Sequence, residues 1–340
     1  MADPKLLNER LQSKRSNEIA GGRDSRKEAK SMKVLVALDA TPQGTQTVRE
    51  VASRLWPEGT QFLLLHVLDP FPFAKAPITL QRAKEAAAVQ LNDASEILKT
   101  AGWKTESDVV LGMARKVVSQ ITASWKADLV MVGSNEAGAL TRLLLGSTAR
   151  SVLRHAPCSV EVVRPALQQK NAGESAEWRV LVATDGSVYS KAAIESVANR
   201  PWPKGSKAKV IAIPEPYMLL GEFPHFELKE IEKLNAAALD DAKRYAQEGA
   251  EVLLKAGLQA VGETPLPKDS DAREIVKEAE QWHARLVVLG SHGRRGFDRM
   301  TMGSVSEHVA LHAPCSVEVI RVPLAPRSKS KQSSKKGAKR

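Results

Sequence analysis

The chain has 340 residues, which is long for one globular domain and suits two of about 150 residues each. Hydrophobic residues make up 43% of it, but no apolar run approaches the roughly 18 residues of a membrane span, so a membrane protein is not expected. The formal charge of +11 is concentrated at the ends, because residues 1–31 carry 8 basic against 5 acidic side chains and residues 326–340 carry 7 basic and no acidic ones. The nearly neutral body argues against a dedicated nucleic-acid-binding fold.

Both ends are polar and are predicted to be disordered. The N-terminal segment has no apolar core, so a signal peptide is not expected. The Lys/Ser tail either makes weak, nonspecific contacts with anionic partners or only keeps the chain soluble. Cys158 and Cys315 have no CxxC neighbour, which favours two reduced thiols in a cytoplasmic protein.

Two copies of one unit make up the body of the chain. The segment KVLVALD at 33–39 recurs as RVLVATD at 179–185, an offset of 146 residues, and HAPCSVEV occurs unchanged at 155–162 and 312–319, an offset of 157. An insertion of 11 residues therefore lies in the second copy, most of it after Ile213. The predicted organisation is a disordered segment (1–31), a first domain (32–164), a linker (165–177), a second domain (178–322) and a basic disordered tail (323–340).

Each copy alternates short apolar runs, which predict buried strands, with segments of helical composition. In chain order, strands are predicted at 34–38, 62–67, 107–111, 129–133 and 159–163, with helices at 43–55, 78–101, 114–126 and 145–155. The second copy repeats this order with strands at 180–184, 209–213, 258–265, 286–290 and 316–320. Five strands interleaved with four helices predict a parallel sheet covered on both faces, so each copy is expected to be a doubly wound, Rossmann-like α/β domain.

The stretch GSHGRRGFDRMTMGS at 290–304 is the strongest candidate for a binding loop. Doubly wound domains bind ligands outside the carboxyl ends of their strands, and if the first and fourth strands are neighbours, Asp185 and this stretch share one crevice. Glycines let an anion approach backbone N–H groups, and Gly303-Ser304 precedes a helix whose first amides can bind phosphate. Other roles stay open: Ser304 as a helix N-cap, Arg294 as a solvated loop residue, and Asp185 as the cap of the following turn.

These motifs resemble the universal stress protein family. The spacing Gly290-x2-Gly293-x9-Gly303-Ser304 is similar to that family's ATP-binding signature, and VLVATDGS, GSHGRRG and HAPCSVEV are similar to its other hallmarks. The resemblance covers both copies and implies a sheet in the order 3-2-1-4-5 and ATP as ligand, with or without Mg²⁺, while ADP and AMP stay open. The nucleotide-binding residues it implies are Asp185, Gly290, Gly293, Gly303, Ser304 and Val305, and the predicted site also includes their neighbours Gly186, Ser187, Ser291, His292 and Arg294.

The two copies depart from the family pattern in different ways. The first keeps Asp39, Gly133, Gly146 and Ser147, but Glu136 stands where a glycine is expected to face phosphate, so its site is predicted to be empty or weak. In the second, the strand end IAIPEP is interpreted as placing Pro214 and Glu215 at the positions of His66 and Val67, which makes adenine specificity less secure than phosphate binding.

The repeated HAPCSVEV predicts an edge strand, and edge strands need cover. The family resemblance implies that 158–163 and 315–320 pair within one chain to close an internal pseudo-dimer, with further dimerisation left open. Three functions are weighed: a nucleotide-binding stress regulator, a scaffold without nucleotide that acts through protein partners, and a slow ATPase. No catalytic or metal-ligating residues are assigned, because the chain has no Walker-type lysine and no recognisable catalytic triad.

Overall fold

The computed structural model describes residues 30–39, 42–134, 145–164, 178–215, 228–294 and 302–322. The N-terminal segment, the linker, the basic tail and most of the 11-residue insertion lie outside these ranges, as do Glu136, Arg295 and Gly296. The predictions made for them are therefore not addressed by the structure.

The first domain contains five strands and four α-helices among its described residues. Its strands are β1 (Lys33–Leu38), β2 (Gln61–Leu68), β3 (Lys104–Leu111), β4 (Leu129–Gly133) and β5 (Ser159–Val163). Its helices are α2 (Pro42–Ala52), α3 (Pro77–Thr100), α4 (Ala114–Trp125) and α5 (Ser147–His155), with a 3₁₀ turn, η2 (Phe71–Phe73), before α3. The predicted alternation is confirmed, with helix ends shifted by up to three residues.

The second domain repeats this order. Its strands are β6 (Arg179–Ala183), β7 (Lys207–Ile211), β8 (Gln259–Glu263), β9 (Leu286–Gly290) and β10 (Ser316–Ile320). Its helices are α6 (Val188–Ala198), α7 (Leu228–Lys255), α8 (Asp271–Gln281) and α9 (Ser304–His312). The turn into α6 is fixed by Ser187, whose Oγ accepts the Ser190 N–H at 3.2 Å as an N-cap.

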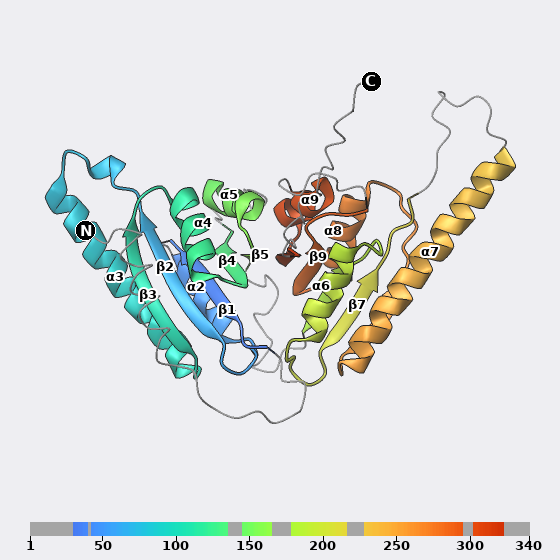
Figure 1. Ribbon diagram of the computed structural model, residues 1–340, viewed down its shortest axis with the longest axis horizontal. Coiled ribbons are helices and arrows are strands. Elements are labelled where there is room, and N and C mark those ends of the chain that lie inside the picture. The colour runs from blue at the N-terminus through green and yellow to red at the C-terminus, as the bar shows by residue number, and fades with distance from the viewer. Residues whose placement is uncertain are drawn as a thin grey trace, which may run out of the picture.

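The described strands form one ten-stranded sheet in the order β3-β2-β1-β4-β5-β10-β9-β6-β7-β8. Each half has the predicted order 3-2-1-4-5, and all pairs within a half are parallel. The halves join through an antiparallel pair, in which Val160 faces Val319 and Val162 faces Val317. The predicted pairing of the two HAPCSVEV strands is thus confirmed, and Figure 1 shows the halves as the two arms of a V.

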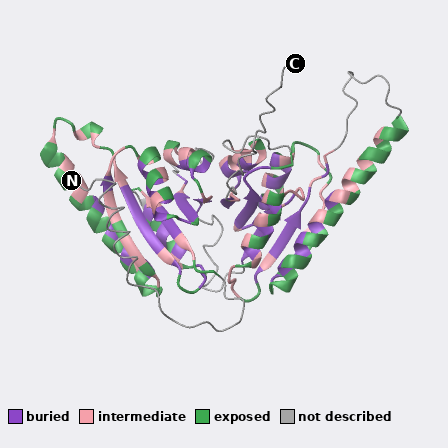
Figure 2. Cartoon of the chain, viewed as in Figure 1, coloured by how far each residue is buried: buried purple, intermediate pink, exposed green. Residues whose placement is uncertain are grey.

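Helices cover both faces of the sheet, as the buried strands require. The long helices α3 and α7 lie on the outer flanks, whereas α5 and α9 lie near the junction of the arms (Figure 1). The strands between them are buried along most of their length (Figure 2). One core cluster crosses the junction, since it contains Val152 and Val160 of the first half together with Val309 and Val317 of the second. The halves therefore share a core and are not merely tethered.

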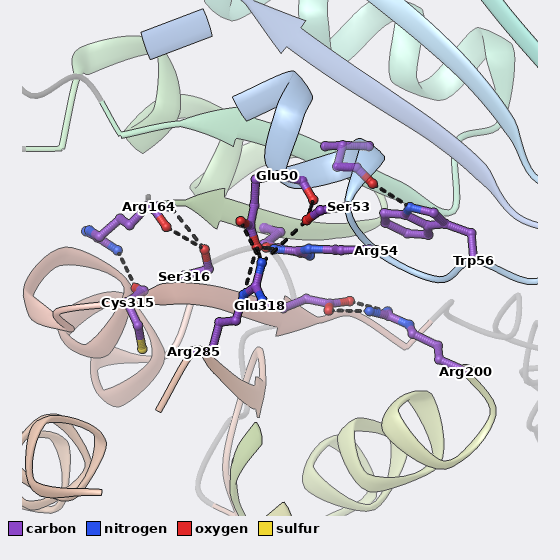
Figure 3. A network of polar contacts seen from close by, with 12 residues as sticks. Glu50, Ser53, Arg54, Trp56, Arg164, Arg200, Arg285, Cys315, Ser316 and Glu318 are labelled. Atoms are coloured by element: carbon purple, nitrogen blue, oxygen red, sulfur yellow. Dashed lines mark hydrogen bonds and ion pairs between the residues drawn. The ribbon is translucent and has the colours of Figure 1, made fainter. Parts of the chain in front are cut away.

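Two charged pairs lie buried at the junction (Figure 3). Glu161 and Glu318 occupy opposite positions of the antiparallel pair, and both are fully buried. Arg54 donates two hydrogen bonds to Glu161, at 2.7 and 2.6 Å, and Arg200 binds Glu318 in the same forked manner. Two carboxylates placed face to face would repel each other, so each arginine is needed to neutralise its own glutamate.

The two cysteines do not bond to each other. Both Cys158 and Cys315 are free thiols, and burial raises the pKa of each to about 12. At neutral pH both are therefore protonated and unreactive. Within the part of the chain that the structure describes, no helix is long and apolar enough to cross a bilayer.

Candidate functional site

A cavity of about 420 Å³ opens at the carboxyl ends of β6 and β9. These strands are neighbours, as the prediction for Asp185 and Gly290 required. Eight of the eleven predicted residues line this cavity: Asp185, Gly290, His292, Gly293, Arg294, Gly303, Ser304 and Val305. Gly186, Ser187 and Ser291 do not line it, because the first two form the turn into α6 and the third points into the protein, where it is 2% exposed.

Asp185 connects the end of β6 to the candidate binding loop. Its Oδ1 accepts the Ser187 N–H at 3.0 Å, and its Oδ2 accepts the Arg294 N–H at 2.8 Å. Burial opposes ionisation of this carboxyl, but the hydrogen bonds from Ser187, Ser190 and Arg294 outweigh it and lower the pKa. The capping role left open by the sequence is therefore present.

Two glycines of the loop are required by close approaches within the protein. A Cβ on Gly293 would lie 2.8 Å from Asp185 Oδ2, so a side chain there would displace the carboxylate. A Cβ on Gly290 would lie 2.7 Å from the backbone carbon of Tyr189, at the start of α6. Gly293 therefore lets the loop approach Asp185 at the end of β6, and Gly290 lets α6 lie close against β9.

The opposite wall of the cavity is the N-terminus of α9. Gly303 is its N-cap, without a side-chain hydrogen bond, and Ser304 is the first helical residue, so the alternative of Ser304 as the N-cap is wrong. Ser306 donates its Oγ–H to the Gly290 carbonyl at 2.6 Å, which holds the helix end against β9. The first amides of α9 therefore face the cavity together with the Ser304 hydroxyl, in the arrangement that favours an anion.

The charged groups at the mouth lie close to each other. Arg294 and Glu215 approach to 3.9 Å, and both are about half exposed, so the pair is weak in water and can open for a ligand. The ring of His292 packs 5.1 Å from Tyr189, and its Nδ1 lies 3.0 Å from Ser291 Oγ. His292 is thus a structural residue that also presents an edge to the cavity.

A second cavity, of about 220 Å³, occupies the corresponding place in the first domain. Asp39, Gly133, Gly146 and Ser147 line it, as expected for a repeat of the same frame. His66 also lines it, donates Nδ1–H to the Leu38 carbonyl at 3.1 Å, and has a pKa lowered by burial. The imidazole is therefore neutral in the wall of the smaller cavity.

The strand register corrects one interpretation of the sequence. Lys33 pairs with Gln61 in the first half and Arg179 with Lys207 in the second, so both strands keep the offset of 146 residues. His66 and Val67 therefore correspond to Ala212 and Ile213, and not to Pro214 and Glu215. Ile211 and Ile213 line the larger cavity as Leu65 and Val67 line the smaller one, so the apolar wall is intact in the second domain.

Several lining residues were not predicted. They are Ala183, Thr184, Ser190, Ile211, Ile213, Glu215, Asp271, Ile275, Leu289 and Ser306. Four of them belong to α6, α8 and α9, and the other six lie in or just after β6, β7 and β9, which meet only in the folded sheet. Asp271 had a usable signal, since it begins a helix after the third strand and so lies at the carboxyl edge of the sheet.

The fold and the two cavities define the class: a tandem α/β protein with two doubly wound domains, each hollowed where such domains bind ligands. The universal stress protein family model matches residues 30–164 and 178–321, and the chain belongs to this family. A universal stress protein of Mycolicibacterium smegmatis is 29% identical over 299 residues, covering 85% of this chain and 96% of its own length. One from Mycobacterium tuberculosis is 26% identical over 311 residues, covering 86% and 97%.

Solved structures agree on the fold. A universal stress protein from Archaeoglobus fulgidus matches 86% of this chain and 97% of its own, with a TM-score of 0.56 and 20% identity. A universal stress protein solved in complex with cAMP matches 39% of this chain and 97% of its own, with a TM-score of 0.31 and 22% identity. The expected family is confirmed by the family model, and the expected fold by the sheet topology and the likeness to the Archaeoglobus fulgidus structure.

Proposed function

We propose that the protein is a stress-response regulator that binds ATP in the second domain, in the cavity between Asp185 and the N-terminus of α9. The observation that carries this proposal is the division of that cavity into two chemically different walls. Ile211, Ile213 and Ile275 form an apolar wall suited to a purine, and the first amides of α9 form an anion-binding wall. Asp185 lies between them, where a ribose hydroxyl would donate to it.

The alternative is a scaffold without nucleotide, and one observation favours it. The polar groups of the loop already have partners within the chain, because Asp185 accepts the Arg294 N–H and Arg294 approaches Glu215. A slow ATPase remains the third candidate. For all three we propose a cytoplasmic protein, with further protein partners or dimerisation and with only weak, nonspecific anionic contacts of the basic tail.

Calorimetric titration of the full chain with ATP tests the proposal, with ADP, AMP and cAMP measured alongside. The informative variant is Ser304→Glu, because Ser304 is the exposed first residue of α9, where an acidic side chain is compatible with the helix. A new charge about 4 Å from a phosphate is worth up to roughly 4 kcal/mol at an effective dielectric near 20, so affinity should fall at least tenfold.

The matched control is Ser147→Glu, which makes the same change at the start of α5. If ATP occupies the second domain, this control binds like the wild type. Equal losses in both variants would place nucleotide in both domains. If the wild type binds none of the four nucleotides, the proposal is wrong and the scaffold function is favoured. If the wild type releases phosphate from ATP and the Asp185→Ala variant does not, the protein is a slow ATPase.

A further inference from the structure

A pair of histidines lies on α9, outside the cavity. His308 and His312 are four residues apart on one face of the helix, and their rings stack with centroids 4.1 Å apart and planes inclined by 27°. Both residues are half-buried, and neither lines the nucleotide cavity. Two imidazoles four residues apart on one helix face can turn about their side-chain bonds until one nitrogen of each binds the same metal ion, as in the H-E-x-x-H pattern.

The hydrogen bonding of His312 leaves the correct atom for a metal. Its Nδ1 lies 2.8 Å from the carbonyl oxygen of His308. A carbonyl only accepts, so Nδ1 carries a proton, and in the neutral form of the ring Nε2 is the nitrogen with the lone pair. This backbone hydrogen bond orients the ring in the way that second-shell partners orient metal-binding histidines. Among the residues that the structure describes, neither Nε2 has a hydrogen-bond partner.

Charged groups near the start of α8 surround His308. Burial, His312 and Arg273 lower the pKa of His308, while the carboxylate of Asp269 acts in the opposite direction. Asp269 is itself held by Arg273 at 2.8 Å, at the start of the neighbouring helix. Neutral imidazole is the form that binds metal ions, so binding should weaken as the pH falls.

We propose that His308 and His312 chelate one borderline transition-metal ion of the Zn²⁺, Ni²⁺ or Cu²⁺ type on the surface of α9. No group of three or more His, Cys, Asp or Glu side chains is arranged for a metal within the described ranges, so water would complete the coordination. Imidazole suits these ions, whereas Mg²⁺ and Ca²⁺ prefer oxygen ligands. The proposal does not depend on nucleotide binding, because no lining residue of the cavity takes part.

The first domain supplies an internal control. His155 occupies the position of His312 on α5 and makes the same Nδ1 contact, 2.9 Å from the Ser151 carbonyl, but Ser151 stands at the position of His308. One imidazole without its partner cannot chelate. Replacing Ser151 with histidine should therefore build the same pair in the first domain.

The experiment is a calorimetric titration of the untagged full chain with NiCl₂ in buffer without chelators. The wild type should bind one Ni²⁺, and His308→Gln or His312→Gln should each weaken it at least about tenfold, because half of the protein ligands are lost. His155→Gln should bind like the wild type, Ser151→His should bind a second equivalent, and MgCl₂ should give no heat. Circular dichroism checks that each variant is folded. A wild type that binds no Ni²⁺, or binding unchanged in both glutamine variants of α9, would overturn the proposal.

Discussion

The two cavities show which features of the site belong to the fold and which do not. Both keep an aspartate after the first strand, a glycine as the last residue of the fourth strand and a Gly-Ser pair at the helix start. The residues around this frame differ, because the second domain has polar side chains where the first has apolar residues or glycine. The corresponding pairs, second domain first, are Thr184 and Leu38, Ser190 and Gly44, Asp271 and Ala114, and Ser306 and Ala149. The frame builds the crevice, whereas the side chains added to it decide whether a polar ligand fits.

The largest expected effect is on the free energy of unfolding, and it tests whether the two buried ion pairs at the junction stabilise the protein equally. Arg54→Met should destabilise the protein by about 3–5 kcal/mol, because it leaves Glu161 buried, unpaired and opposite Glu318. Arg200→Met should have a similar effect through Glu318. Urea unfolding of the two variants measures both values. A loss below 1 kcal/mol in either would mean that the buried glutamate relaxes to water or is protonated.

A smaller difference in stability is expected at the glycines that end the fourth strands, Gly133 in β4 and Gly290 in β9. Gly290→Ala should cost about 1–3 kcal/mol, because its Cβ would meet backbone atoms of α6 that cannot move independently. Gly133→Ala should cost less, since its Cβ would lie 3.0 Å from the Thr47 hydroxyl oxygen, which belongs to a side chain. Thermal unfolding compares them. Equal losses would show that the close approach at α6 is not tighter than the one at α2.

The smallest effect concerns Asp185 and depends on pH. Its pKa is lower in the folded protein than in the unfolded chain, so the ionised carboxylate contributes stability above the ordinary value near 4, and this contribution is lost as pH falls through the folded value. Asp185→Asn should therefore be less stable than the wild type at pH 7, by about 1 kcal/mol, and nearly equal to it in acid. Denaturation at several pH values checks this, and a deficit that is constant with pH would contradict it.

The periodicity of the sequence predicted the fold and the cavity frame, but it misplaced one strand by two residues. The error arose at β7, where Lys207 and Lys209 look like the polar start of a strand whose apolar part is VIAI. Lys209 in fact lies inside β7, and its ammonium is paired with Glu263 at 2.8 Å and Glu278 at 2.9 Å. These partners are 54 and 69 residues away, so no local pattern could have shown that a lysine there is compatible with a buried strand.

The antiparallel joint between β5 and β10 also fixes how many sites of each kind exist. Two separate domains joined only by such strands would dissociate on dilution, and identical copies could re-pair in any combination. Here both strands belong to one chain, so each meets the other at an effective concentration in the millimolar range, independent of how much protein is present. Every molecule therefore carries one large and one small cavity in a constant ratio of one to one. Dilution and mixing cannot produce a molecule with two cavities of the same kind, except by exchange of whole halves between chains.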